Sequence, residues 1–451
     1  MSIYLPLALL VASPGASAAQ LEWAGHYRAR GLLYDSLSLS DTNAQAEGTS
    51  NLFDHRLRLQ PRFHITERVG LYAQIDALNL VPWGEQIEGW EDPVTGDTTY
   101  LAYDQTLVAP TTTTGAASPL GIGVTRAWGE VYTDIGRFRF GRVPLHWGAG
   151  IWQNDGFAPD AEFGDTADRI QFTSRVGVLY LMAAYDVNYE GYLNAPDDMQ
   201  SLNAAFAYQT ESLGLGFHNQ YRWQPSEALS LYTGDLWAHA KMGTVEIETE
   251  VVGVFGAGNL GGGANDLRIA SVGAMLRGEA ELDKILVGVE GGLATGDAEP
   301  DDGNIKTFTF DRDHNLTLML FEEPMPTLEA TTANETNGGR DYDAVRTGEG
   351  IRNALYIRPH VGYRILDELT VDLAVFGAQA ARLPEADRDA KGYGWEFDAS
   401  VLYEPYEHFS LCGKAGLFLP GSYYSAYEDD ELGGGFDKPA IGGMLMGTVQ
   451  F

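Results

Sequence analysis

Hydrophobic and polar residues alternate along much of this chain with a period of two. Between residues 21 and 33 the apolar parity holds Leu21, Trp23, Tyr27 and Leu33, and the polar parity holds Glu22, His26, Arg28 and Arg30. Residues 56–65 repeat the pattern, with Leu57, Leu59, Phe63 and Ile65 between Arg56, Arg58, Gln60, Arg62 and His64. This period is that of a β-strand with one apolar and one polar face. The strands of a soluble β-sandwich alternate in the same way as those of a membrane barrel. The lengths of the connections between strands must therefore distinguish these two folds.

Short and long connections follow one another along the chain. The short ones lie at 66–68, 133–136, 211–213, 283–284, 367–368 and 406–408, and long polar stretches lie at 35–51, 82–121, 148–168, 297–353, 384–392 and 420–439. Short turns at one rim and long loops at the other are typical of outer-membrane barrels. The predicted strands lie near 21–34, 54–66, 69–81, 122–133, 136–146, 168–175, 178–188, 200–210, 214–223, 228–242, 244–255, 267–282, 285–295, 354–365, 369–380, 394–404, 408–418 and 441–451. We therefore predict an all-β, transmembrane, antiparallel up-and-down barrel of about 18 strands.

One segment could change this number to 16 or 20. Residues 306–321 read as a hairpin that could extend a loop above the membrane, fold inward as part of a plug, or add two strands to the wall. Acidic residues flank the segment on both sides, at 297–302 and at Glu322 and Glu323. These flanks favour the external loop.

The beginning of the chain predicts export. Residues 3–12 form an apolar stretch of signal-peptide length, and Ala16-Ser17-Ala18 matches a signal-peptidase site. Beyond Gln20 no apolar run reaches the about 20 residues that a membrane-spanning helix needs. In lipid only helices and closed barrels satisfy their backbone hydrogen bonds. We expect a signal peptide at 1–19 and a single barrel domain at 20–451, in the outer membrane of a Gram-negative bacterium.

Composition narrows the partners. The 451 residues include 63 acidic and 29 basic side chains, a net charge of −34, so the phosphates of nucleic acids would be repelled. Acidic loops are compatible with an outer leaflet of lipopolysaccharide that divalent cations bridge. The single Cys412 leaves neither an intramolecular disulfide nor a cysteine-based zinc site. No cofactor or metal is expected.

The last residues carry a resemblance to a known class. The chain ends Met444-Leu445-Met446-Gly447-Thr448-Val449-Gln450-Phe451. An alternating final strand that ends in Phe resembles the C-terminal assembly signal of bacterial outer-membrane proteins. The resemblance implies that the barrel-assembly machinery is a partner during biogenesis and that Phe451 is part of the signal.

A second resemblance covers residues 136–170. The run Phe138-Arg139-Phe140-Gly141-Arg142, followed by Leu145, Trp147, Gly148 and Gly150, resembles the alginate-export and related porin families. Residues 153–169 also resemble an uncharacterised outer-membrane barrel family. The first resemblance implies a barrel with an Arg-rich lumen, and some members of those families have 18 strands. Neither resemblance identifies a substrate.

Charges on the inward parity are segregated around the predicted ring. The basic wall is Arg28, Arg30, Arg56, Arg58, Arg62, His64, Arg126 and Arg139, with Glu130 as a local partner of the last. The acidic wall is Glu246, Glu248, Glu250 and Glu290. In a ring of 18, strands two and eleven are diametrically opposed, so these walls would set a transverse field across the lumen. The alternative is that these charges only solvate the lumen or pair with loop carboxylates.

The acidic stretch 148–168 has two interpretations. The first is a solvated external loop, because its carboxylates do not match the spacing of an EF-hand calcium site. The second is a constriction loop inside the barrel. Its candidate residues are Trp152, Asp155, Phe157, Asp165 and Asp168.

Enzymatic function is not expected. Asp54-His55 and Asp313-His314 are the nearest candidates for a catalytic pair, and neither lies near a nucleophile motif such as G-x-S-x-G. The leading hypothesis is a channel for passive diffusion of small hydrophilic solutes, anionic or saccharide-like. The alternative is a non-conducting barrel, plugged by its loops, that acts as a receptor or as a structural anchor of a cell-envelope complex. The oligomeric state stays open.

We predict that mature protein extracted from membranes begins at Ala19 or Gln20, because the small residues Ala16 and Ala18 define the cleavage site. Intact-mass spectrometry checks this. Retention of Met1 in membrane-extracted protein would contradict the export argument.

Overall fold

The computed structural model describes residues 19–39, 49–82, 122–190, 197–259, 267–298, 302–323, 350–383, 390–425 and 434–451, with a few residues between these ranges. All but the last residue of the predicted signal peptide lies outside the described residues. So do most of the predicted loop near 82–121 and about half of the predicted loop near 297–353.

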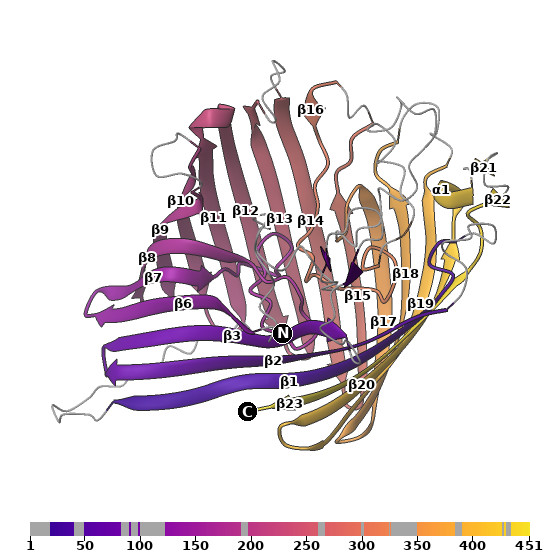
Figure 1. Cartoon of the computed structure of the whole chain (residues 1–451), viewed down its shortest axis with the longest axis horizontal. Coiled ribbons are helices and arrows are strands. Elements are labelled where there is room, and N and C mark those ends of the chain that lie inside the picture. The colour runs from indigo at the N-terminus through magenta and orange to yellow at the C-terminus, as the bar shows by residue number, and fades with distance from the viewer. Residues whose placement is uncertain are drawn as a thin grey trace.

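Eighteen antiparallel strands close into a barrel, as the sequence predicts (Figure 1). They are β1 (Gln20–Asp35), β2 (Thr49–Thr66), β3 (Val69–Pro82), β6 (Ile122–Thr133), β7 (Gly136–Pro144), β8 (Thr166–Val176), β9 (Leu179–Tyr189), β10 (Met199–Gln209), β11 (Leu213–Gln224), β12 (Leu229–Met242), β13 (Val245–Gly258), β14 (Leu267–Leu282), β15 (Ile285–Ala294), β17 (Ala354–Leu366), β18 (Leu369–Ala380), β19 (Gly392–Tyr406), β20 (Phe409–Pro420) and β23 (Ala440–Gln450). Each strand pairs with the next in this order, and β1 pairs with β23.

Seven short elements of the described residues lie outside this ring. β4 (Trp90–Glu91) pairs with β5 (Thr98–Thr99), and β21 (Glu428–Asp429) pairs with β22 (Gly434–Gly435). β16 (Asn304–Ile305) runs parallel to the end of β14. The helix α1 (Ser422–Ser425) follows β20, and a 3-10 helix, η1 (Pro225–Glu227), joins β11 to β12. No described helix is long and apolar enough to cross a membrane.

The period-two pattern separates the two faces of the wall. Leu33, Val124 and Ile170 are more than half exposed on the outer face, where lipid would cover them. On the opposite parity Arg28, Asp186 and Glu250 are fully buried. A slip of one residue between neighbouring strands would exchange the faces, so burial inside and lipid outside fix the register.

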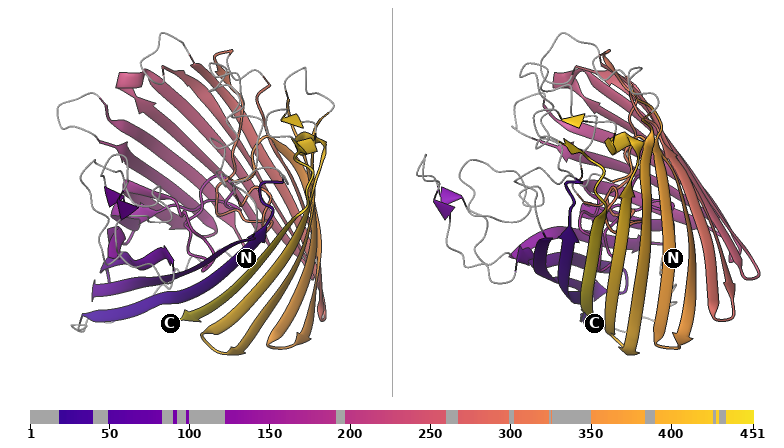
Figure 2. Two further views of the ribbon diagram at one scale, coloured as in Figure 1. Left: turned by 45° about the vertical axis from the view of Figure 1, so that its right-hand side comes forward. Right: turned by 90° about the vertical axis from the view of Figure 1, so that its right-hand side faces the viewer.

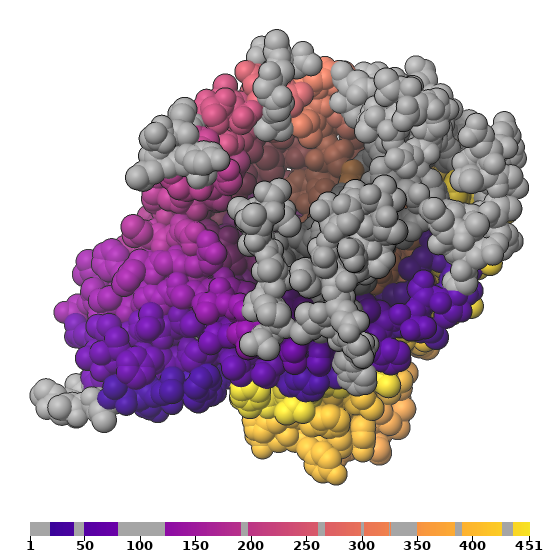
Figure 3. All heavy atoms as spheres, viewed as in Figure 1, coloured from indigo at the N-terminus to yellow at the C-terminus, as the bar shows by residue number. Residues whose placement is uncertain are grey.

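The turns at one rim are tight and the connections at the other rim are long (Figure 2). Asp283 and His408 take left-handed backbone conformations, with φ of 59° and 69°, in the turns before β15 and β20. Such conformations suit two-residue hairpin turns, because their twist matches that of the strands. Figure 3 shows an opening above the near strands, and atoms of the far wall are visible at its back.

The barrel closes at a backbone pair between its two ends. Gly25 and Phe451 exchange two hydrogen bonds, of 2.9 and 3.1 Å. Gly25 has a φ of +153°, and a Cβ placed there would lie 2.1 Å from the carbonyl oxygen of Arg58. Only glycine fits this position.

The main apolar cluster of the molecule lies inside the barrel. Inward-facing residues of the wall, among them Tyr356, Phe376 and Phe418, pack against Phe310 and Met319, which are 1 and 0% exposed. The preference for residues 306–321 as an external loop is therefore wrong. The acidic flanks that suggested it find partners in the lumen: the Tyr34 hydroxyl donates to the Glu323 carboxylate at 2.6 Å.

We predict that Phe451→Ala lowers the yield of folded barrel, because the aromatic ring ends the closing strand and belongs to the assembly signal that the sequence resemblance implies. Heat-modifiable migration in detergent gels measures the folded fraction, and total expression should not change. Tyr406→Ala is the matched control, since Tyr406 is a 75% exposed aromatic residue at the same rim. Equal folded fractions for Phe451→Ala and the parent would contradict the prediction.

Candidate functional site: two loops inside the barrel

The connection between β7 and β8, residues 145–165 (loop A), folds into the lumen. At one end it reaches the wall of β11–β13, where the Ala149 N–H donates to the Glu250 carboxylate at 2.5 Å. The rings of Trp147 and Trp152 pack against the His218 ring with centroid distances of 5.2 and 5.1 Å. Loop A therefore crosses the lumen rather than extending into solvent, which favours its interpretation as a constriction loop.

The other part of loop A rests on arginines of β1, β2 and β6. Its carbonyl oxygens accept guanidinium hydrogen bonds from four of the predicted basic-wall residues. The bonds run from Arg28 to Pro159 (3.0 Å), from Arg56 to Ala161 (2.7 Å) and Pro159 (3.0 Å), from Arg58 to Gly156 (2.5 Å), and from Arg126 to Asp165 (3.1 Å). Arg28 and Arg56 are 0% exposed as a result. The basic wall is thus covered by the loop that it holds.

Only some of these arginines have a carboxylate partner. Asp54 pairs with Arg28 at 3.5 Å and Arg30 at 2.6 Å, and Glu162 of loop A contacts both. Arg58 pairs with Asp76 at 2.7 Å. Among the described residues, neither Arg56 nor Arg126 has a carboxylate oxygen within 4.0 Å, and their partners are carbonyl, hydroxyl, amide and imidazole groups. Two guanidinium groups at the edge of loop A therefore make no ion pair with a described carboxylate, although Asp76 and other carboxylates lie near enough to act on their charge.

Residues 302–323, between β15 and β17, form a second inward loop (loop B). The Glu396 carboxylate of β19 accepts three of its backbone N–H groups, those of Leu318, Met319 and Leu320, each at 2.8 Å. His314 contacts Glu290 of β15 at 2.9 Å. Loop B thus lines the wall from β14 round to β1. At its end, burial of the Glu323 carboxyl group raises the pKa of that group to about 7.

The two loops meet at a cluster of three aspartates. The Asp313 carboxylate of loop B accepts the backbone N–H groups of Glu162, Phe163 and Gly164, with shortest distances of 2.7, 3.2 and 2.7 Å. The Asp311 N–H donates to the Ile151 carbonyl at 2.8 Å. Asp165 and Asp311 lie near each other at the same place, since each acts on the charge of the other. We call Asp165, Asp311 and Asp313 the loop junction.

The remaining predicted wall residues face the lumen in different surroundings. Glu246, Glu248 and Glu250 follow the inward parity of β13, nine strands away from β2 in the ring. Glu248 pairs with Arg277, and Glu246 with Lys241. Arg139 and Arg137 pair with Glu130 at 2.7 and 3.4 Å. Arg62 and His64 are more exposed, towards the short-turn rim of β2.

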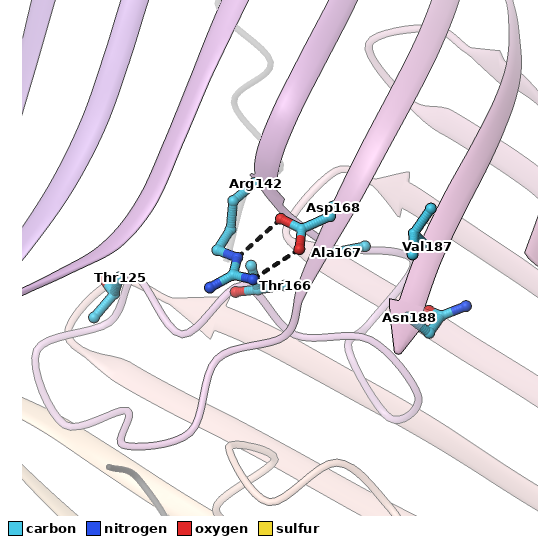
Figure 4. A pocket seen from close by; sticks show the side chains of 7 residues that line it. All are labelled: Thr125, Arg142, Thr166, Ala167, Asp168, Val187 and Asn188. Carbon is cyan, nitrogen blue, oxygen red and sulfur yellow. Dashed lines mark hydrogen bonds and ion pairs between the residues drawn. The ribbon is translucent and has the colours of Figure 1, made fainter. Parts of the chain in front are cut away.

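Asp168 does not belong to the constriction. It lies in β8 on the parity of the outward Ile170, and it forms two hydrogen bonds with Arg142 of β7, at 2.9 and 2.7 Å (Figure 4). Both side chains are about half exposed on the outer surface, at 55 and 49%. They line a pocket of about 210 Å³ with Thr125, Thr166, Ala167, Val187 and Asn188 (Figure 4). The sequence places Asp168 among loop acids, but β8 begins two residues earlier and directs it outward.

Of the other loop A candidates, Trp152, Asp155, Phe157 and Asp165 do lie inside the barrel. Phe157 is 42% exposed, and the Arg126 guanidinium lies 5.4 Å from the centre of its ring. Asp155 caps the neighbouring backbone by accepting the Phe157 N–H at 3.1 Å. Within the described ranges, no three His, Cys, Asp or Glu side chains are placed to hold a metal ion.

Several important carboxylates were not selected from the sequence. Asp54 and Asp313 were considered only as neighbours of histidines, and Glu396 was not considered. Each binds groups far away in the chain: Asp313 holds amides about 150 residues away, and Glu396 holds amides 76–78 residues away. The position of Asp54 and Glu396 on the inward-facing parity of their strands is the one sequence feature that could have marked them as lumen residues. Asp313 had none, because it lies in a loop.

Comparisons with known proteins agree on the fold. No protein-family model matches the chain, and no curated protein matches its sequence. Among solved structures, a BenF-like porin from Pseudomonas fluorescens Pf-5 superposes with a TM-score of 0.55 at 10% identity, covering 96% of this chain and 98% of that one. OccK2 (OpdF) of Pseudomonas aeruginosa in complex with glucuronate gives 0.53 at 11% identity, covering 96% of both chains. OpdK of the same species with vanillate gives 0.52 at 9% identity, covering 95 and 98%. The chain has the fold of the 18-stranded outer-membrane porins.

We predict that Asp313→Ala loosens loop A without unfolding the barrel. Hydrogen bonds to a charged acceptor contribute about 1.5–3 kcal/mol each, so the amides of Glu162, Phe163 and Gly164 should exchange hydrogen roughly 10- to 100-fold faster. Hydrogen-exchange mass spectrometry in detergent measures this. Asp302→Ala, at an exposed position of the same loop, is the control. Unchanged protection of residues 162–164 would contradict the assigned role of Asp313.

Proposed function

We propose that this protein is a passive outer-membrane channel with a preference for small anionic solutes. It would reside in the outer membrane of a Gram-negative bacterium, with lipopolysaccharide around its outer face and the barrel-assembly machinery as its partner during insertion. The porin fold is that of non-enzymatic channels, and none of the charged residues described above is proposed to be catalytic.

The observation that carries the anion preference is that the guanidinium groups of Arg56 and Arg126 make no ion pair with a described carboxylate. Both lie against loop A, where it narrows the lumen, and both bind only neutral groups. A neutral acceptor satisfies the N–H groups of an arginine without cancelling its charge. The positive potential therefore extends into the remaining passage, where low-dielectric walls strengthen it. The net charge of −34 acts less there, since exposed charges are screened beyond about 8 Å at physiological salt.

The ligands of two fold neighbours have the chemistry that such a field would select. OccK2 (OpdF) is in complex with glucuronate and OpdK is with vanillate, and both ligands carry a carboxylate. At about 10% identity the fold alone is shared, so these ligands give a class of test solute: small hydrophilic carboxylates.

One observation favours a second candidate, a plugged barrel that serves as a receptor or anchor. Loop B packs an apolar cluster into the lumen: Phe308, Leu318 and Leu320 are at most 7% exposed. Loop B also contacts loop A, through Asp313 and Asp311. A barrel whose loops leave no continuous passage would show no ionic conductance in planar bilayers.

Single-channel recording of purified protein separates the two candidates. Discrete conductance steps with a reversal potential on the anion side, in a salt gradient, are expected of the channel. Complete absence of steps, with folded protein shown by heat modifiability, would favour the plugged barrel.

We predict that Arg126→Gln and Arg56→Gln each shift the selectivity towards cations. A unit charge about 5 Å from a permeating ion in water contributes about 0.8 kcal/mol, or roughly a fourfold change in the permeability ratio. Reversal potentials in a salt gradient measure this ratio. Arg142→Gln is the matched control, because that arginine lies on the outer face. A shift with Arg142→Gln of equal size, or none with either of the other two variants, would contradict the proposal.

A further inference from the structure

We propose that the outer-face pocket at Arg142 binds the phosphate group of an outer-leaflet lipid, with the guanidinium of Arg142 as its ligand. The inference goes beyond the channel function and does not depend on conduction, because the pocket lies on the outer side of the wall. The lipid class is that of lipid A, a phosphorylated sugar that carries acyl chains.

The pocket lies where the apolar outer face of the wall ends. The outward residues Phe140 and Ile170, which are partners in the register of β7 and β8, are 52 and 63% exposed. Arg142 and Asp168 are the next outward pair towards the long-loop rim, and β7 continues for only two more residues, to Pro144. The outer face therefore changes from apolar to charged within one step along the strand. Such a change is expected at the border between acyl chains and head groups.

Tyrosines of the neighbouring strand indicate the same depth. Tyr185 and Tyr189 of β9 are outward and are 37 and 53% exposed. Tyr185 lies opposite Ile170 in the register, one step from the position of Asp168. Aromatic residues gather at the two lipid–water interfaces of an outer-membrane barrel, and the interface near the long loops is that of the outer leaflet. Because a charged side chain costs least at an interface, Arg142 fits the depth of the lipid head groups.

The pairing of Arg142 leaves one edge of its guanidinium free. Its Nε and its terminal Nη2 donate to the two carboxylate oxygens of Asp168, at 2.9 and 2.7 Å. The other terminal nitrogen, Nη1, points away from Asp168 (Figure 4). A guanidinium has further N–H groups beyond the two that this pairing uses. The edge formed by Nη1 and Nη2 can therefore donate to two oxygens of a phosphate, a planar geometry that arginine provides and lysine does not.

The pocket gives this edge space and access. Its volume is about 210 Å³, and the residues beside the charged pair are neutral: Thr125, Thr166, Ala167, Val187 and Asn188 (Figure 4). The side chains of Arg142 and Asp168 are 55 and 49% exposed, so the pocket is open from the membrane side. A chain of net charge −34 repels lipid phosphates as a whole, and their binding therefore requires a local cation.

Two variants separate a lipid site from an ion pair that only joins β7 to β8. Arg142→Gln and Asp168→Asn both break the pair, but only the first removes the phosphate ligand. A lipid site predicts weaker lipid binding for Arg142→Gln. For Asp168→Asn it predicts binding at least as strong as that of the parent, because asparagine removes a negative charge beside the phosphate. Arg68→Gln is the matched control, since Arg68 forms an exposed ion pair with Asp134, at 2.9 Å, at the short-turn rim.

Native mass spectrometry of the full barrel measures the binding. The protein in detergent is titrated with lipid A, in an excess of chelator so that no divalent cation bridges Asp168 to the phosphate. Loss of the charge-assisted contact should raise the dissociation constant of Arg142→Gln about tenfold, and Arg68→Gln should bind as the parent does. Dephosphorylated lipid A should bind the parent as weakly as lipid A binds Arg142→Gln.

Three results would overturn the proposal. The first is equal affinity of the parent and Arg142→Gln for lipid A, or an equal loss in Arg142→Gln and Asp168→Asn. The second is binding that needs divalent cations, disappears in Asp168→Asn and survives in Arg142→Gln, because the carboxylate would then be the ligand. The third comes from inorganic phosphate: displacement of lipid A at equal concentration would assign the pocket to free phosphate. Lipid A that stays bound under this competition supports the lipid site.

Discussion

The hydrogen bonds from wall arginines to backbone carbonyls of loop A determine much of what this barrel contains. Arg28, Arg56 and Arg58 hold residues 156–161 against β1 and β2, and Arg126 holds the end of the loop. A carbonyl oxygen satisfies a guanidinium N–H but leaves its charge in place. The same bonds therefore fix the loop, and for Arg56 and Arg126 they take the place of an ion pair with a described carboxylate. Any substitution that removes one of these arginines should loosen loop A.

The carboxylates of the lumen complement this arrangement. Glu396 and Asp313 accept backbone N–H groups, three each, and Glu250 accepts that of Ala149. Arginine side chains of the wall thus donate to backbone carbonyl groups of loop A, and carboxylate side chains accept from backbone N–H groups of the two loops. A buried loop leaves many backbone groups without a strand partner, and charged side chains of the wall satisfy them. Two long segments can consequently lie inside the barrel although they form almost no regular secondary structure.

Strand number and the facing of side chains were predictable because they depend on local alternation. The eighteen strands and the inward parity of Arg28, Arg56, Glu250 and Glu290 follow from residues two apart. The partners of these side chains did not follow, since a carbonyl of Pro159 or an amide of Leu318 carries no sequence signal. Residues 306–321 show the same limit: apolar positions there were consistent with wall, loop or plug, and only the distant Phe376 and Phe418 decide between them. Asp168 was misplaced because composition marks a loop as acidic but does not mark where the next strand begins.

The backbone pair of Gly25 with Phe451 has a consequence for how the ring can form. Its closing seam joins β1 to β23, the first and last strands, over the register from His26–Gln450 to Asp35–Ile441. Until β23 has been synthesised, β1 is a sheet edge with a full row of unpaired donors and acceptors, and such an edge can neither enter lipid nor remain safely in water. The ring therefore cannot close before β23 has been made, and any sheet that forms earlier exposes this edge of β1.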